Sequence, residues 1–202
     1  ARLYKYVDPT TAWTNVTRAA GGDYTVAADD RWSFDQFGPT TLIACQIGDV
    51  LQSINVDSGT NFAAVAGSPP QAKNCKTVGS QLWLGNLSGF PNRVEWSGRG
   101  DHAYWTVNKR DCNLQDFQDG GHVRGITGME VGMVMHDETI RRFMPIDSRA
   151  VYRFDRIEDS HGLISPHSLV TLGRVAYYYS QDGFFASDGS GAKVPIGEDR
   201  IN

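Results

Sequence analysis

Apolar and polar residues alternate with a period of two in short segments bounded by glycine, proline, asparagine, aspartate or serine. This alternation is typical of β-strands, whose successive side chains point to opposite faces of a sheet. The clearest strand candidates are residues 82–84, 93–96, 140–146, 151–157 and 175–180. The only helical candidate of any length, residues 108–118, lacks a clear apolar stripe and is followed by Gly120-Gly121. The pattern predicts an all-β fold of many short strands.

The strand candidates belong to a unit that occurs four times. Each unit has apolar residues, then glycine or a polar turn, then an alternating strand, then a second turn and a last strand. The glycines that align between units are Gly38, Gly79, Gly128 and Gly173, at steps of 41, 49 and 45 residues. A period of about 40 to 50 residues with several strands per unit is typical of β-propellers. One small sheet cannot bury both faces alone, and stacking such sheets around an axis covers them.

We therefore predict a single β-propeller-like domain, or a segment of one, over residues 1–202. It is an array of antiparallel blades of roughly 40–50 residues, of which this chain holds all or only a part. Residues 1–17 form a leading hairpin with Asp8-Pro9 as its turn, and residues 32–202 hold about four blade units.

The aromatic segment "YYYSQDGFFASDGSG" (177–191) reads as two strands joined by a tight turn at Asp182-Gly183. This turn occupies the same place in its unit as "QIGD", "GNLSG" and "MHDE" do in theirs. Alternation places Tyr177 and Tyr179 on one face and Tyr178 on the other. Both faces of this strand then need cover from adjacent blades or from another subunit.

No motif in the sequence assigns a catalytic, cofactor-binding or metal-binding residue, and we predict none of the three. The five histidines never have the His-x-x-x-His spacing of a metal site, and no Cys-x-x-Cys occurs. His161 lies close to Glu158 and Asp159, and a histidine near carboxylates could act as a general base. We favour the simpler interpretation, a polar loop between two strands, for His161 and for the nearby His167.

The three cysteines, Cys45, Cys75 and Cys112, are an odd number at wide spacing, which favours reduced thiols in a protein made in a cytosol. Cys45 alternates with Ile43 and Ile47, so we expect it to be buried inside a blade.

No apolar run of about 18 residues exists, so a membrane span is not expected. The first residues lack the apolar segment of a secretory signal. A net charge of −4 argues against broad nucleic-acid binding.

Several longer phrases occur together in a fixed order, and their most specific element is "NRV-x-WSG-x-x-D…W" followed by "DGG-x-V-x-G-I". The ordered set over residues 32–202 resembles propeller proteins that lie below the portal of short-tailed phages. These are variously called tail hub, nozzle, tubular protein B or packaged-DNA stabilisation protein. The phrases are "WSFDQFG" (32–38), "AGSPPQAK" (66–73), "LWLGNLSGFPNRVEWSGRGDHAYWT" (82–106), "DFQDGGHVRGITGMEVGMVMHDETIRRF" (116–143), "FDRIEDSHGLISPHSLVTLGRVAYYYSQDGFFASDGSG" (154–191) and "PIGEDRIN" (195–202).

The resemblance implies a structural virion protein of the tail or head-to-tail junction, made in the host bacterial cytoplasm. It implies a homo-oligomeric ring, a hexamer, that contacts the portal or adaptor and other tail proteins. Double-stranded DNA would pass through without sequence-specific binding, retained before infection and released on ejection. The family brings no catalytic residues. Its members are usually longer than 202 residues, which leaves the number of blades open.

The alternative is a propeller-fold glycan-binding protein or hydrolase with a site at its axis. A well-formed pocket that holds paired Asp or Glu side chains with an opposed Arg would favour this alternative. A conduit protein should instead bury its long loops against neighbouring subunits.

Overall fold

The computed structural model is all-β and describes residues 1–8, 12–128, 131–191 and 193–197. Its strands form a two-stranded hairpin and four four-stranded antiparallel sheets. Within the described residues the only helical segment is the 3₁₀ helix η1 (Pro166–Ser168). The predicted all-β class is confirmed, and the sheets form an incomplete propeller-like array.

Each four-stranded sheet, here called a blade, is built from strands that pair in chain order. The leading hairpin is β1 (Tyr4–Val7) and β2 (Ala12–Asn15). The first blade is β3 (Ser33–Phe37), β4 (Thr41–Cys45), β5 (Gln52–Asn55) and β6 (Ala63–Ala64). The second is β7 (Ala72–Val78), β8 (Gln81–Leu87), β9 (Phe90–Trp96) and β10 (Asn113–Asp116). The third is β11 (Val123–Ile126), β12 (Gly132–His136), β13 (Ile140–Pro145) and β14 (Tyr152–Glu158). The fourth is β15 (Val170–Leu172), β16 (Val175–Ser180), β17 (Gly183–Ser187) and β18 (Lys193–Ile196).

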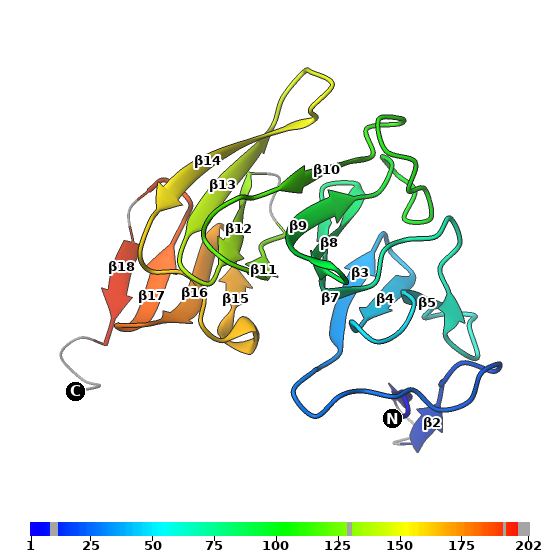
Figure 1. The fold of residues 1–202 in the computed structure, drawn as a ribbon. Coiled ribbons are helices and arrows are strands. Elements are labelled where there is room, and N and C mark those ends of the chain that lie inside the picture. Colours follow the sequence, from blue (N-terminus) through cyan, green and yellow to red (C-terminus); the bar gives the residue numbers. More distant parts are fainter. Residues whose placement is uncertain (9–11, 129–130, 192, 198–202) are drawn as a thin grey trace.

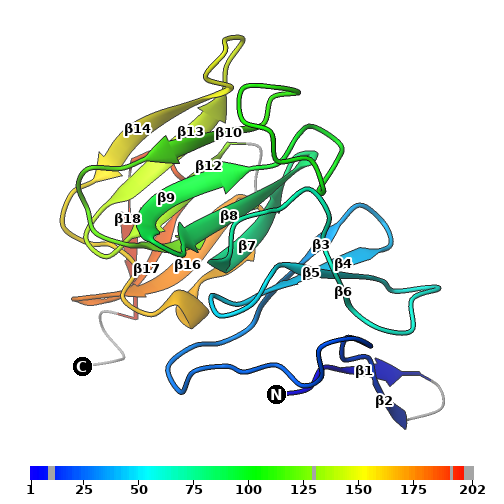
Figure 2. The ribbon, with the colours of Figure 1, turned by 45° about the vertical axis from the view of Figure 1, so that its right-hand side comes forward.

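Successive blades stand side by side, with the leading hairpin next to the first blade (Figures 1 and 2). The first strands of neighbouring blades approach one another, since β3 lies beside β7 and β7 lies beside β11. These strands form the inner side of the array. The expected turn of the leading hairpin at Asp8-Pro9 lies partly outside the described residues, as does most of the phrase at 195–202.

The four aligned glycines occupy the first turn of their blades, which confirms the repeat. Gly38, Gly79 and Gly173 each have a φ near +60°, a conformation that costs glycine little. Gly128 lies two residues after the end of β11, in the connection to β12. The longest step, from Gly79 to Gly128, contains the loop between β9 and β10.

The helical candidate at residues 108–118 is wrong. Asn108, Arg110 and Asp111 all have positive φ, which a right-handed helix does not allow. The chain makes tight turns there and continues into β10, the fourth strand of the second blade. The backbone carbonyl of Asp111 accepts hydrogen bonds from Gln81 Nε2 at 3.0 Å and Trp96 Nε1 at 2.8 Å, so these turns are held against the blade.

The hydrophobic core consists of separate clusters, one in each gap between neighbouring sheets. The second and third blades enclose the largest, in which the Trp83 ring lies 4.8 Å from Trp96, 4.6 Å from Phe143 and 4.7 Å from Tyr152. Another cluster joins the first and second blades, and another joins the third and fourth. The leading segment packs on the first blade through the fourth cluster.

The aromatic segment forms the β16–β17 hairpin of the fourth blade, as predicted, but the two turn residues are Gln181 and Asp182, and Gly183 is the first residue of β17. Tyr178 is fully buried against the third blade with Ala176 and Phe185. Tyr177 and Tyr179 lie on the opposite face and are 37% and 38% exposed. The alternation is therefore confirmed, but the described residues supply no full cover for the second face.

All three cysteines are buried and unpaired, and the predicted burial of Cys45 is confirmed. Cys45 packs in the cluster between the first and second blades. Burial raises the pKa of Cys45 well above its ordinary value, and raises the pKa of Cys112 to about 11. Both thiols therefore carry their protons at neutral pH.

Substitution Trp83→Ala should lower the free energy of unfolding by about 3–5 kcal/mol, the range for removing a fully buried large aromatic side chain. Trp83 contacts rings from two blades, so its loss opens a void in their interface. Val50→Ala, at a site 43% exposed, is the control and should change stability by less than about 0.5 kcal/mol. Urea unfolding followed by circular dichroism measures both. Equal losses in the two variants would contradict the interface packing.

Substitution Gly183→Val should cost about 1–3 kcal/mol, because Gly183 has a φ of +126° that a β-branched residue resists. A Cβ added there would meet no atom within 4 Å, so the cost comes from the backbone alone. Gln181→Val in the same turn, where φ is not positive, is the control. Thermal unfolding of both variants tests this. A Gly183→Val chain with an unchanged melting temperature would show that the turn differs from the one described.

Candidate functional site

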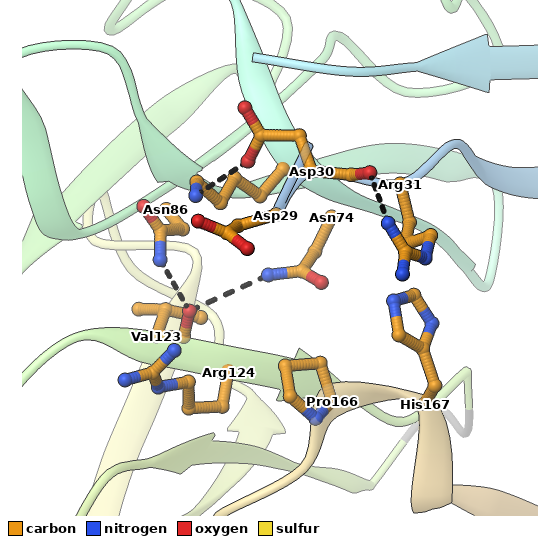
Figure 3. A pocket seen from close by; sticks show the side chains of 10 residues that line it. Asp29, Asp30, Arg31, Asn74, Asn86, Val123, Arg124, Pro166 and His167 are labelled. Carbon is orange, nitrogen blue, oxygen red and sulfur yellow. Dashed lines mark hydrogen bonds and ion pairs between the residues drawn. The ribbon is translucent and has the colours of Figure 1, made fainter. Parts of the chain in front are cut away.

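A small polar pocket of about 200 Å³ opens at the inner side of the array and is here called the axial pocket. The segment before β3, strands β7, β8 and β11, and η1 all contribute to it, so its walls come from the second and third blades and from the segments that precede the first and fourth (Figure 3). It is lined by Asp29, Asp30, Arg31, Lys73, Asn74, Asn86, Val123, Arg124, Pro166 and His167.

Two asparagines fix the floor of the axial pocket. The carbonyl oxygen of Val123 accepts hydrogen bonds from Asn86 Nδ2 at 3.0 Å and Asn74 Nδ2 at 3.4 Å. These bonds tie the second blade to the first strand of the third. Asn86 is buried and has a φ of +56°, a conformation that asparagine tolerates better than most residues. The hydrogen bonds to the Val123 carbonyl therefore fix the orientation of both amide side chains.

Most charges around the axial pocket are already paired within the protein. Lys73 Nζ lies 2.7 Å from Asp30 Oδ1, and the Arg124 guanidinium forms an ion pair with Asp137. Arg31 donates hydrogen bonds to the backbone carbonyls of Ala28 and Asp30. Its guanidinium and the His167 ring point toward one another at the rim (Figure 3).

The axial pocket holds part of the residue content expected for the hydrolase alternative, namely two aspartates and two arginines. Their pairing differs from that of a hydrolytic site, where two carboxylates face the bond to be cleaved. Asp30 forms an ion pair with Lys73, while Asp29 lies in a turn and is exposed. The arrangement can bind a small polar group through Arg31, His167 and the asparagines, but it presents no acid–base pair.

A second polar cluster surrounds His161, where the third blade meets the fourth. Nε2 of His161 lies 2.6 Å from Asp182 Oδ2 in the β16–β17 turn. Nδ1 lies 2.9 Å from Ser160 Oγ and 3.2 Å from Glu158 Oε1, and it also contacts Lys193 Nζ. Lys193 on β18 completes the cluster through an ion pair of 2.9 Å with Glu158 Oε2. The turn residue Asp182 thus links its hairpin to the third blade.

Ser160, His161 and Asp182 form a chain of hydrogen bonds like that of a serine nucleophile, but two features exclude that role. Lys193 also lies at His161 Nδ1, the nitrogen that would take the serine proton. The backbone N–H groups of residues 159 and 160 donate to Glu158 Oε1, so they cannot stabilise an oxyanion. The cluster is a link between blades, in keeping with the interpretation of His161 as part of a polar loop.

Glu158 is the most strongly shifted acid of the cluster. Burial raises the pKa of its carboxyl, but hydrogen bonds from Lys193, the Ser160 N–H and His161 outweigh burial and bring the pKa down to about 2. Burial and the Glu158 charge raise the pKa of Tyr178 to about 12. Glu158 is therefore ionised at all ordinary pH values and depends on Lys193 for compensation.

Other kinds of site find no support among the residues described. They include no group of three or more His, Cys, Asp or Glu side chains that could hold a metal ion. Around His161 the two carboxylates bond opposite nitrogens of the ring, so they share no common centre. Over the same residues, no helix is long and apolar enough to cross a membrane.

Sequence reasoning found the residues around His161 but missed the axial pocket. Glu158 and His161 lie near each other in the chain, whereas Asp182 joins them only through blade packing. The axial pocket draws residues from segments as distant as Asp29 and His167, so no local pattern marks it. The repeat was the one indication of this pocket in the sequence, because the first strands of propeller blades converge at the axis.

Comparison with known proteins identifies the fold alone. No family model matches the chain, and no curated protein matches it. Among solved structures it is similar to the extracellular domain of the putative one component system BT4673 from B. thetaiotaomicron, with a TM-score of 0.56 and 12% identity. That match covers 100% of this chain and 27% of the other, so the chain spans about a quarter of that protein's length.

Folding lowers the pKa of the Glu158 carboxyl from 4.5 to about 2. Substitution Glu158→Gln should therefore lower the free energy of unfolding at pH 7 by about 2 kcal/mol, which allows for partial solvent screening of the charge. The folded-state pKa is depressed, so the carboxylate contributes fully above its unfolded pKa near 4.5 and loses that contribution as pH falls toward 2. The gap between wild type and variant should therefore close between pH 4.5 and 2. Urea unfolding across this range measures it, with Glu138→Gln, at an exposed position, as control. A gap that stays constant with pH would contradict the Lys193 pairing.

Proposed function

We propose that the chain is a structural protein of a bacteriophage tail or head-to-tail junction, a nozzle or hub that forms part of the DNA conduit. In this role it retains the packaged genome and permits its ejection. It acts in a homo-oligomeric ring, a hexamer by the resemblance, in contact with the portal or adaptor and other tail proteins. It resides in the virion tail after synthesis in the bacterial cytoplasm and is not an enzyme.

The observation that carries this proposal is the resemblance over residues 32–202 to the tail proteins of short-tailed phages. The outward side of the fourth blade, here called the terminal face, is apolar: seven of its nine residues are between 37% and 71% exposed among the described residues, and Val175 and Ala186 are half-buried. Monomeric soluble proteins rarely expose a continuous apolar surface of more than a few hundred Å². The terminal face consists of Val170, Leu172, Val175, Tyr177, Tyr179, Phe184, Ala186, Val194 and Ile196.

Two further observations agree with an architectural role. The phrases that resemble the phage tail proteins fall on the blade strands and their turns, so the resemblance follows the repeat. The charged groups around the axial pocket are mostly paired with one another, which leaves little net charge to hold a passing DNA phosphate chain.

Proteomic mass spectrometry of purified virions from a phage that encodes this chain tests the proposal. The chain should be present at six copies per particle, counted against the portal protein as internal standard. Particles assembled without it should lose packaged DNA, measured as nuclease-sensitive genome. Absence of the chain from washed virions, or particles that keep their DNA without it, would contradict the proposal.

The axial pocket favours a second candidate, a glycan-binding propeller. Oriented asparagine side chains and an arginine at the rim are groups that hold sugar hydroxyls and carboxylates. A glycan array probed with the purified chain, beside the variant Arg31→Ala, separates this candidate from the first. Glycan binding that depends on Arg31, together with absence from virions, would favour the glycan-binding function.

A further inference from the structure

Two opposite charges of the axial pocket have no counter-charge inside the protein. Asp29 and Arg31 both line the pocket and are exposed. Within the described part of the chain neither takes part in an ion pair, whereas Asp30, which lies between them in the sequence, is paired with Lys73. The axial pocket therefore keeps one negative and one positive charge that a ligand can neutralise.

The turn that carries these two charges is held in place by its own hydrogen bonds. The backbone N–H of Asp30 donates to the carbonyl of Ala27 at 3.1 Å. Nη1 of Arg31 donates to the carbonyls of Ala28 at 3.0 Å and Asp30 at 2.9 Å. The ion pair with Lys73 Nζ, at 2.7 Å, ties the turn to β7. Because the turn is already ordered, a ligand loses less affinity to the cost of fixing these groups.

The side of the pocket near the asparagines offers hydrogen-bond acceptors. Asn74 and Asn86 both direct Nδ2 to the Val123 carbonyl, at 3.4 Å and 3.0 Å, so their Oδ1 atoms point away from it. No hydrogen-bond donor among the described residues reaches either Oδ1 atom. These two oxygens and the Asp29 carboxylate make three free acceptor groups, which matches the three N–H donors of an ammonium group.

The rim of the pocket offers donors instead. The Arg31 guanidinium and the His167 ring point toward one another (Figure 3), and no hydrogen bond joins them within the described residues. A guanidinium can only donate, so an anion that lies between the two side chains can accept from both. A carboxylate fits this place better than a phosphate, because the nearby charges of Asp29 and Asp30 repel a dianion more strongly.

The size of the axial pocket limits the ligand to a small molecule. Its volume of about 200 Å³ equals the share of roughly seven water molecules in the liquid, at about 30 Å³ each. Sites for drug-sized ligands usually have about 300–1,000 Å³. The pocket therefore suits one compact molecule that carries both an ammonium and a carboxylate.

We propose that the axial pocket binds a free α-amino acid as a zwitterion. Its ammonium lies at Asp29 and the two asparagine oxygens, and its carboxylate lies at Arg31 and His167. A neutral sugar would leave both Asp29 and Arg31 without a counter-charge, and an acidic sugar would compensate Arg31 alone. This inference goes beyond the virion role and does not rest on it.

Isothermal titration calorimetry on the purified chain tests the site with the common α-amino acids, one at a time, up to millimolar concentration. At least one should bind. The amino acid that binds most tightly is then compared with its N-acetyl derivative, which lacks the ammonium, and with its α-amide, which lacks the carboxylate. Each derivative should bind at least about tenfold more weakly, because each loses one set of charge-assisted hydrogen bonds.

Variants assign each charge of the ligand to its partner. Asp29→Asn and Arg31→Gln should each weaken binding of the amino acid at least about tenfold. Arg31→Gln should leave the affinity for the α-amide unchanged, and Asp29→Asn should leave that for the N-acetyl derivative unchanged. Asp57→Asn and Arg174→Gln, at exposed positions outside the pocket, are the controls and should bind as wild type does.

Three outcomes would overturn the proposal. They are the absence of binding for every amino acid, binding that neither Asp29→Asn nor Arg31→Gln weakens, and binding of glucose or glucuronate through Arg31 in place of amino acids. The last outcome would favour the glycan-binding candidate. If Arg31→Gln fails to fold by circular dichroism, His167→Ala at the same rim replaces it and should weaken binding of the amino acid but not of its α-amide.

The virion role and this site fail in different experiments. A chain counted in virions that binds no amino acid retains the virion role and loses the site. A chain that binds an amino acid but is absent from virions retains the site and loses the virion role.

Discussion

Burial of both faces of each small sheet is the constraint on which the rest of this structure depends. A four-stranded blade has apolar side chains on its two sides, as β12 shows with Val134 toward the second blade and Met133 and Met135 toward the fourth. Each buried Å² of such surface contributes roughly 25 cal/mol, so every side of a blade that a neighbour covers adds to its stability. The stacked rings around Trp83 are the densest instance of this packing. Turns, inner strands and polar clusters all take their positions from it.

The same packing decides where glycine is required on strands rather than in turns. A Cβ on Gly85 of β8 would come within 2.9 Å of Val123, and one on Gly125 of β11 would come within 2.7 Å of Leu169. Each glycine thus marks a point where one blade presses on the next. Neither glycine has a positive φ, so close packing between blades, and not backbone conformation, requires glycine at these positions.

Local patterns in the sequence predicted the blades well because their determinants are local. Turn glycines such as Gly79 and Gly173 indicate the repeat. Alternation in β16 predicts that Tyr178 lies on one face of the sheet and its two tyrosine neighbours on the other. The strand β10 was missed because Asn113–Asp116 has one apolar residue in four and is held by pairing with β9. The axial pocket and the bond between Asp182 and His161 were missed for a related reason. They exist only once separate blades are stacked, and the geometry of stacking cannot be predicted from any short segment.

Strand pairing in strict chain order has a consequence for how the protein is made. Every sheet pairs only neighbouring segments, so each blade can form as soon as its own residues leave the ribosome, without waiting for a distant partner. Its following side, however, stays bare until the next blade has been synthesised. The growing chain therefore carries one exposed apolar sheet at every stage of translation, and the pace of elongation sets how long each sheet is open to misassociation with other nascent chains.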